Sequence, residues 1–218
     1  MSIFAISDIH GRIIELNNLL DFIEFQPTDM IVFLGDYIDR GSNSFEVIER
    51  LIEIKRLVPN SYFLMGNHEE MAIASKDDSD VFEYWMKYGG DKTLNSYPEG
   101  IPEEHWYFMS QLTPYLETES AIYVHAGLQE ELPMDKQPSE KLRWDRLTKE
   151  IVHYTNKKIY CGHSSQASGF PSLYGDARCI ECVGWLTAIN VETDFVYQVN
   201  MQSQRAFYIQ EHSVKTSL

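Results

Sequence analysis

The sequence is poor in cysteine, in long apolar runs and in positive charge near its beginning. It contains three cysteines, Cys161, Cys179 and Cys182, which are too few for a disulfide framework. The longest uninterrupted apolar run covers residues 30–34, whereas a membrane-spanning helix needs about 20 apolar residues. No basic residue precedes Arg12, so the charged start of a secretory signal is missing. Together these absences predict a cytoplasmic protein.

Basic residues are also scarce in the chain as a whole. The 218 residues include 18 lysines and arginines against 33 aspartates and glutamates, and the formal net charge is −15. Affinity for nucleic acid or for an anionic membrane comes largely from basic side chains that displace counterions. We therefore expect neither as a partner, and any anionic substrate must meet local positive charge.

The first third of the chain alternates short apolar segments with helical patterns. The apolar segments 3–6, 30–34 and 62–65 predict strands. Between them, apolar residues recur at helical spacing at Leu16, Leu19, Leu20 and Ile23, and at Val47, Ile48, Leu51 and Ile52. A strand, a crossover helix and a parallel strand take about 30 residues, which fits these separations. We therefore expect an α/β layer here.

The rest of the chain divides into a helical part and a strand-rich part. Residues 69–112 are predicted to be a solvated helical insertion, broken at Gly89 and Gly90. Later apolar segments predict strands at residues 121–124, 158–161, 177–183, 185–190, 195–199 and 205–209. Those of the C-terminal third, from residue 158 on, are expected to pair mainly as antiparallel hairpins. Because no long linker separates independent parts, residues 1–218 are expected to form a single domain.

Five predicted strands end in a cluster of polar residues. The clusters are Asp8-x-His10-Gly11, Gly35-Asp36-x-x-Asp39-Arg40-Gly41, Gly66-Asn67-His68-Glu69, His125-Ala126-Gly127 and Gly162-His163. Ligands of open α/β sheets gather at the carboxyl ends of the strands. All five clusters can therefore converge on one crevice.

The residue types in these clusters suit divalent metal ions. Aspartate, histidine and asparagine, with no thiolate required, favour Mn²⁺, Fe²⁺ or Zn²⁺. The six candidate ligands are Asp8, His10, Asp36, Asn67, His125 and His163. The first three would hold one ion, and the last three would hold a second ion together with a shared Asp36. Two adjacent ions can bind one phosphoryl group and deprotonate a bridging water, which attacks in line. We expect manganese, with iron or zinc as alternatives.

The order of the motifs resembles that of the phosphoprotein phosphatase superfamily, in particular its short bacterial and phage serine/threonine phosphatase branch. The resemblance covers about residues 3–190. It implies an α/β fold of the calcineurin-like metallophosphoesterase type, a β-sandwich flanked by helices with a helical insertion. The six candidate ligands fall on the family's metal ligands. His68 falls on its general acid, which protonates the leaving oxygen, and Asp39 on the carboxylate that orients this histidine.

The resemblance also implies residues that bind the substrate phosphate. Arg40 falls on a phosphate-binding arginine, and Asn67 is expected to contact the substrate as well as a metal ion. The family's second arginine lies near a tryptophan. Next to Trp144 we therefore choose Arg146, with Arg143 as the second choice.

The implied activity is phosphomonoester hydrolysis by direct attack of a metal-bridging water. We expect a protein serine/threonine phosphatase that acts on phosphorylated protein or a small phosphoester. A symmetrical bis(5'-nucleosyl)-tetraphosphatase, which would hydrolyse diadenosine tetraphosphate, is the alternative. A phosphodiesterase or nuclease is less favoured, because such enzymes typically carry Gly-His-x-His and Ser165 stands where the second histidine would be. A phosphate-binding module without turnover would lack a ligand or the general acid, and this sequence has them all.

Other conspicuous residues are interpreted as structural. Cys179 and Cys182 have the spacing of a metal or redox pair, but no second pair exists, so we expect buried structural cysteines. Gly89 and Gly90 are expected to form a simple turn rather than the hinge of a lid. Aromatic residues at helical spacing are expected to pack rather than to line a substrate rim, namely Trp85, Tyr88, Trp106 and Tyr107.

Overall fold

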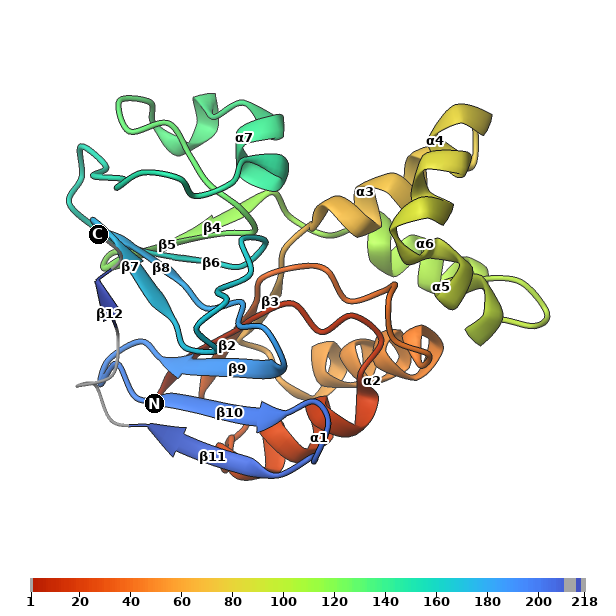
Figure 1. Ribbon diagram of the computed structural model, residues 1–218, viewed down its shortest axis with the longest axis horizontal. Coiled ribbons are helices and arrows are strands. Elements are labelled where there is room, and N and C mark those ends of the chain that lie inside the picture. Colours follow the sequence, from red (N-terminus) through yellow and green to blue (C-terminus); the bar gives the residue numbers. More distant parts are fainter. Residues whose placement is uncertain (1, 210–214, 217–218) are drawn as a thin grey trace.

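Two six-stranded sheets pack face to face at the centre of the molecule (Figure 1). The computed structural model describes residues 2–209 and 215–216. The first sheet has the order β11-β10-β9-β1-β2-β3, with the bounds Ala206–Ile209, Val196–Asn200, Trp185–Asn190, Ile3–Ile6, Met30–Phe33 and Ser61–Phe63. The second has the order β12-β7-β8-β6-β5-β4, with the bounds Lys215–Thr216, Ser172–Tyr174, Ala177–Cys179, Lys158–Cys161, Ala121–Val124 and Tyr115–Glu117. This is the predicted β-sandwich.

The strands divide their side chains between two apolar layers because successive side chains point to opposite faces of a sheet. In β1, Phe4 and Ile6 join the cluster beneath the helices, whereas Ala5 faces the second sheet. Val32 of β2 and Tyr123 of β5 belong to the same layer as Ala5, between the sheets. Each large apolar side chain that is fully buried contributes about 1.5–3 kcal/mol. Burial on both faces explains why these strands are continuous apolar runs.

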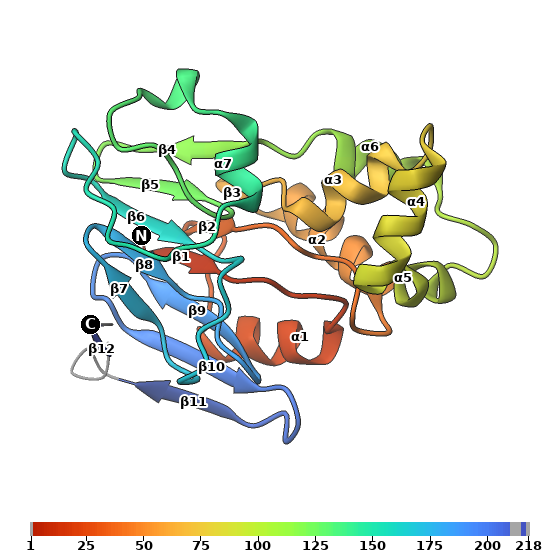
Figure 2. The same cartoon turned by 45° about the horizontal axis from the view of Figure 1, so that its top comes forward.

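Helices α1 (Ile13–Phe22) and α2 (Ser44–Leu57) follow β1 and β2, as predicted. The strands β1, β2 and β3 pair in parallel, so each helix is the crossover between neighbouring strands. Helix α1 packs against β9 and β10, and its apolar face lies in the same cluster as Phe4 (Figure 2). None of the described helices combines the length and the apolar character needed to cross a membrane.

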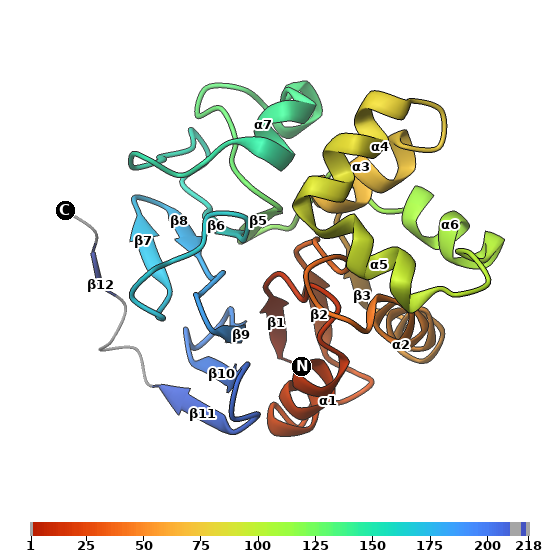
Figure 3. The same cartoon turned by 45° about the vertical axis from the view of Figure 1, so that its right-hand side comes forward.

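The predicted insertion is helical and follows β3 in the chain, before β4. Its helices lie together on one side of the molecule (Figure 3). It comprises α3 (Asn67–Ala74), α4 (Ser79–Trp85), the wide turn η1 (Met86–Gly90), α5 (Asp91–Ser96) and α6 (Glu103–Ser110). Gly89 has φ +110°, and a Cβ atom there would lie 2.8 Å from the backbone nitrogen of Arg40. The glycine therefore forms a kink inside the helical run and lets this run approach the loop after β2. Two shorter elements lie beside the second sheet, η2 (Met134–Lys136) and α7 (Ser139–Trp144).

The prediction of antiparallel hairpins is confirmed for one part of the C-terminal third and wrong for another. Strands β9, β10 and β11 pair antiparallel. Strands β5, β6 and β8 pair in parallel, because the segments that join them are long enough for the crossover that parallel strands need. Strand β8 ends at Cys179 rather than at residue 183, and before β9 begins the chain makes isolated bridges such as Gln166 to Cys182. Strand β7 was not predicted.

Replacing Gly89 by alanine is expected to destabilise the fold more than replacing Gly100, which lies in the open loop before α6. Both residues have positive φ, +110° and +87°, so either alanine incurs the strain of left-handed backbone, about 1–2 kcal/mol. Only at position 89 would the new Cβ meet backbone atoms, since nothing lies within 4 Å of that position at Gly100. Urea unfolding of Gly89→Ala and Gly100→Ala measures the difference. Equal losses of unfolding free energy would contradict the close packing.

Candidate metal centre

The loops that follow strands of both sheets bring the predicted ligands together. The first sheet contributes Asp8 and His10 after β1, Asp36 after β2 and Asn67 after β3, and the second contributes His125 after β5 and His163 after β6. Ligand atoms of Asp36, His125 and His163 lie within 4.8 Å of one another, and so do those of His10, Asp36 and His68. Asp36 belongs to both groups, as a shared carboxylate requires. Residues from both sheets are therefore positioned to bind a metal centre.

Backbone hydrogen bonds fix the loops after β1 and β2 against each other. The N–H groups of Ile9 and His10 both donate to the carbonyl of Asp36 at 2.9 Å, and Gly41 N–H donates to the carbonyl of His10 at 3.0 Å. Left-handed backbone, which is strained for residues other than glycine, occurs at His10, Asp36, Asp39, Arg40 and His163. Such strain persists only where the surrounding structure enforces it, and it clusters at functional sites.

Glu69, the last residue of the Gly-Asn-His-Glu motif, holds the loop that carries Asp36. Its buried carboxylate accepts backbone N–H bonds from Asp36 at 2.9 Å, Tyr37 at 2.7 Å and Gly66 at 3.1 Å. Because Glu69 lies in the first turn of α3, these bonds tie the loop after β2 to the helix that begins at Asn67. Glu69 had no predicted role beyond its place in the motif.

Three histidines of the centre each hold one ring nitrogen at a backbone carbonyl. The contacts are His10 Nδ1 to Ile38 O at 2.9 Å, His125 Nδ1 to Leu34 O at 2.8 Å and His163 Nε2 to Trp144 O at 3.2 Å. A carbonyl can only accept, so these ring nitrogens must be the protonated ones. The other nitrogen of each neutral ring then presents a lone pair to the cluster, which is the arrangement of metal-ligating histidines.

The donor atoms fit a cation better than they fit one another. Asn67 Oδ1 lies 3.0 Å from His125 Nε2 and 3.0 Å from His163 Nδ1. With the ring protons on the carbonyl side, all three atoms are acceptors and no hydrogen is shared among them. His10 Nε2 is likewise buried without a hydrogen-bond partner among the described residues. A metal ion would satisfy these atoms, since each can donate a lone pair to it.

Burial also sets the protonation of the centre. Burial lowers the pKa of His10 to about 3 and that of His163 to about 4, so both are neutral near pH 7, the form that binds metal. Burial would raise the pKa of Asp36, but the surrounding histidines outweigh it and the pKa is lowered. The pKa of Asp8 is raised by burial and by the nearby charges of Glu181 and Asp36.

His68 and Asp39 form a buried pair beside the cluster. Nδ1 of His68 lies 2.6 Å from Oδ2 of Asp39, whose side chain is fully buried. The same carboxylate accepts the indole N–H of Trp85 at 2.8 Å and the hydroxyl of Thr93 at 2.6 Å. The helical insertion thus supplies two of the donors that hold Asp39. Neither Trp85 nor Thr93 was predicted to contact the site.

The other ring nitrogen of His68 faces the centre. Nε2 lies 3.3 Å from Nη2 of Arg40 and 3.8 Å from Oδ2 of Asp36. Burial lowers the pKa of His68, but the charges of Asp36 and Asp39 outweigh burial and raise it above the ordinary value. The imidazole is therefore held in a place where it can carry a proton close to the predicted ligands.

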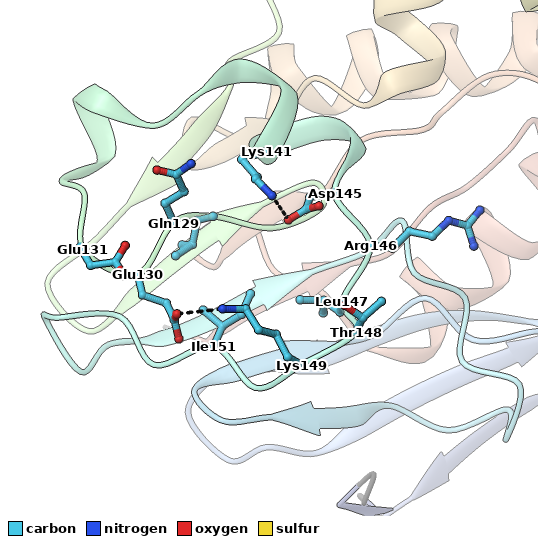
Figure 4. A pocket seen from close by; sticks show the side chains of 11 residues that line it. Gln129, Glu130, Glu131, Lys141, Asp145, Arg146, Leu147, Thr148, Lys149 and Ile151 are labelled. Atoms are coloured by element: carbon cyan, nitrogen blue, oxygen red, sulfur yellow. Dashed lines mark hydrogen bonds and ion pairs between the residues drawn. The ribbon is translucent and has the colours of Figure 1, made fainter.

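The two candidate arginines near Trp144 lie in different surroundings. Arg143 is engaged in an ion pair with Glu70 of α3, at 2.5 Å between Nη2 and Oε1. Arg146 is exposed, and its side chain extends away from the other residues around a cavity of about 280 Å³ (Figure 4). The charge of Arg146 helps to lower the pKa of His163, which places it near the centre. Of the two, Arg146 is the arginine available to a ligand.

The residues interpreted as structural behave mostly as predicted. All three cysteines are free and buried. Trp85 is buried, with 1% of its surface exposed, and Trp106 packs against the core. Tyr88 and Tyr107 are 46% and 67% exposed and do not join the core, although the ring of Tyr88 lies 4.6 Å from that of Tyr84.

One acidic residue at the centre was missed by the prediction. Ligand atoms of Glu181 lie within 4.8 Å of those of Asp8 and His10. The pairing of the strands explains its position, because β6 and β8 pair in parallel with Cys161 opposite Cys179. Glu181 comes two residues after Cys179, just as His163 comes two residues after Cys161. It could therefore be found only once that pairing is known.

Residues 1–192 match the family model of the calcineurin-like phosphoesterases. The chain belongs to this family. It is therefore a metallophosphoesterase that hydrolyses phosphoesters, and the family and fold expected from the motifs are confirmed. The cluster of aspartate and histidine side chains offers the ligands that a metal-dependent hydrolysis of phosphoesters needs.

Solved structures of similar fold bear different names. A provisionally assigned diadenosine tetraphosphatase has 19% identity and a TM-score of 0.63, with 97% of this chain and 95% of that chain covered. A cold-active protein tyrosine phosphatase of a psychrophilic Shewanella has 17% identity and a TM-score of 0.67, covering 96% and 80%. A protein serine/threonine phosphatase of Saccharomyces cerevisiae has 18% identity and a TM-score of 0.59, covering 99% and 81%. These likenesses show the shared fold, and the specific substrate of this phosphoesterase is a separate question.

Replacing Asp36 by asparagine is expected to lower the metal content of the protein, because the carboxylate that belongs to both groups of candidate ligands loses its charge and one ligand oxygen. Elemental analysis after dialysis against Mn²⁺ measures this content. Asp29→Asn is the matched control, since Asp29 is also buried but lies at the opposite end of β2. Two ions retained at full occupancy in Asp36→Asn would contradict the bridging role.

Proposed function

We propose that this phosphoesterase is a protein serine/threonine phosphatase that uses two divalent ions, Mn²⁺ in the first instance. The observation that carries the proposal is the buried pair of His68 and Asp39 beside the metal centre. Asp39 holds Nδ1 of the imidazole at 2.6 Å, and Nε2 faces the cluster. A histidine fixed in this way is suited to donate a proton from Nε2 to a leaving oxygen.

The need for such an acid depends on the leaving group. A serine or threonine alkoxide is a poor leaving group until it is protonated. The phenolate of tyrosine has an ordinary pKa of about 10 and leaves more easily. A nucleotide leaves as a phosphate oxygen and needs the acid least. The oriented His68 therefore supports an alkyl phosphomonoester as the substrate.

The arginines would bind the phosphate from the solvent side. Arg40 is exposed and lies next to Nε2 of His68, and Arg146 is exposed near His163. Two exposed guanidinium groups at the rim can meet a phosphate presented on a protein surface. Asn67, at the start of α3, would contact both the substrate and a metal ion.

The metal ions would be held by Asp8, His10 and Asp36 and by Asp36, Asn67, His125 and His163. When bound, they would supply a Lewis acid for the phosphoryl group and activate the attacking water. They would also reverse the sign of the local charge, because two dications outweigh the buried carboxylates. This reversal would let a chain of net charge −15 bind an anionic substrate.

The proposal extends to partners and place of action. Phosphorylated proteins or small phosphoesters would be the substrates, and the acidic chain makes nucleic acid and anionic membranes unfavourable partners. Three free, buried cysteines support a reducing, cytoplasmic environment.

A diadenosine tetraphosphatase is the second candidate, and one cavity favours it. An apolar cavity of about 390 Å³ is lined by residues from α3 and the loop before it, from the segment before β4 and from α7, namely Met65, Glu70, Ile73, Ala74, Leu112, Pro114 and Arg143. Arg143, which lines this cavity, precedes Trp144 in the chain, and the backbone carbonyl of Trp144 contacts His163. The apolar lining could take up a purine base, and a phosphopeptide would not require such a site.

A substrate panel tests the proposal. The metal-stripped enzyme with Mn²⁺ restored is offered a phosphoserine peptide, a phosphotyrosine peptide and diadenosine tetraphosphate. We expect kcat/KM for the phosphoserine peptide to exceed the other two by at least about tenfold, a modest difference for enzyme specificity. Faster hydrolysis of diadenosine tetraphosphate would instead establish the second candidate.

Replacing His68 by alanine is expected to lower kcat for the phosphoserine peptide by roughly 10²- to 10⁴-fold, the range of a general acid. The loss should be smaller for an aryl phosphate, whose leaving group does not need the proton, and the metal content should stay unchanged. His105→Ala is the matched control, because His105 is equally buried but contacts Tyr97 and Glu49 in the helical part. Equal losses on alkyl and aryl esters would remove His68 from this role.

A further inference from the structure

Glu181 belongs to none of the motifs, yet it lies inside the metal centre. It comes from the segment between β8 and β9, and only 8% of its surface is exposed. Its ligand atom lies within 4.8 Å of those of Asp8 and His10, so the three form a group at the end of the first sheet. This is the side of the centre where Asp8 and His10 would hold an ion together with Asp36.

The carboxylate of Glu181 has one tethered oxygen and one oxygen without a partner. Oε1 accepts a hydrogen bond from the hydroxyl of Ser165. Oε2 is buried and has no hydrogen-bond partner in the described part of the chain, and the same holds for His10 Nε2. Leaving such atoms buried and unsatisfied is costly. Both can donate a lone pair, so a cation between them would satisfy both at once.

The spacing also points to an ion rather than to a direct bond. No ion pair joins Glu181 to His10 among the described residues, whereas His10 and Asp36 approach to 3.7 Å. Two ligands that each lie about 2.1 Å from one metal ion are held apart by it and make no hydrogen bond to each other. The group of Asp8, His10 and Glu181 therefore has the separation of ligands around a common centre.

The backbone places Glu181 with the same precision as the predicted ligands. Its carbonyl accepts the N–H of Gln166 at 2.8 Å, and Ile180 N–H donates to the carbonyl of Cys161 at 2.9 Å. Both contacts attach the segment to the loop that carries His163. The position of the carboxylate is thus fixed by the chain rather than by an adaptable surface loop.

We propose that Glu181 is a further ligand of the ion held by Asp8, His10 and Asp36. The assignment rests on the metal pair of the proposed function. It gives this ion three carboxylates and one imidazole, whereas the other ion would have one carboxylate, one amide oxygen and two imidazoles. An oxygen-rich, more negative ligand set favours a hard divalent cation such as Mn²⁺. The two sites are therefore chemically different.

Calorimetric titration of the metal-free full-length protein with Mn²⁺ alone tests the assignment without any substrate. We expect Glu181→Gln to weaken one of the two Mn²⁺ binding steps by at least about tenfold, the lower end of the cost of changing even a group behind the ligands. Asp176→Asn is the matched control. It removes the same charge at the opposite end of β8, where Oδ2 of Asp176 is also buried without a partner in the described residues, and it should retain both steps.

Thermal unfolding separates ligation from a purely structural role. In chelator, Glu181→Gln should unfold at the same temperature as the wild type or higher, because an unpaired buried charge is removed. In Mn²⁺ its gain in unfolding temperature should be smaller than that of the wild type. A lower unfolding temperature in chelator with an undiminished gain in Mn²⁺ would mean that the carboxylate serves only its bond to Ser165, and would overturn the proposal.

A crystal structure of the Mn²⁺-loaded wild type gives a second test that needs no variant. A Glu181 oxygen about 2.2 Å from an ion that also contacts Asp8 would support the assignment. A Glu181 carboxylate separated from that ion by a water molecule would overturn it, even if phosphatase activity is confirmed. Conversely, failure of every phosphoester in the substrate panel would leave the Mn²⁺ binding measurements intact, so the two proposals can fail separately.

Discussion

Several acidic side chains buried close together are the constraint on which the rest of this structure depends. Asp8, Asp36 and Glu181 lie within one small region, and burial together with mutual repulsion raises the pKa of Asp8. Little of this arrangement is open to bulk solvent, because all three residues are at most 8% exposed. The left-handed loops, the carbonyls that orient the histidines and the N–H bonds to Glu69 all fix groups around this charge. The local fold is therefore arranged for cations.

Beyond the residues of α3, the helical insertion is coupled to this region through Asp39. Asp39 receives the indole N–H of Trp85 and the hydroxyl of Thr93, and it holds His68 with the oxygen that accepts the indole N–H. Gly89 lets the insertion approach the loop after β2 closely enough for these contacts. The insertion thus carries the proposed general acid on α3 and also supplies, from Trp85 and Thr93, two of the donors that hold its partner Asp39.

The sequence was informative where function depends on position along a strand, and less so where it depends on contacts between distant segments. That the six candidate ligands come together could be predicted, because each follows the carboxyl end of a strand. Glu181 could not, since it lies between two cysteines with no neighbouring motif, and only the parallel pairing of β6 with β8 places it at the centre. The engagement of Arg143 by Glu70 joins residues 73 apart and left no local signal. The direction of strand pairing was missed because it depends on long crossovers.

The candidate ligands come from both halves of the sandwich. Asp8, His10 and Asp36 follow strands of the first sheet, and His125 and His163 follow strands of the second. Ions bound between them would cross-link the two sheets where these strands end. When metal is scarce, the protein would lose this cross-link as well as its catalytic ions. The sheets could then separate locally, and the exposed segments would be open to proteases. Metal supply would in this way govern how long the protein survives as well as how fast it works.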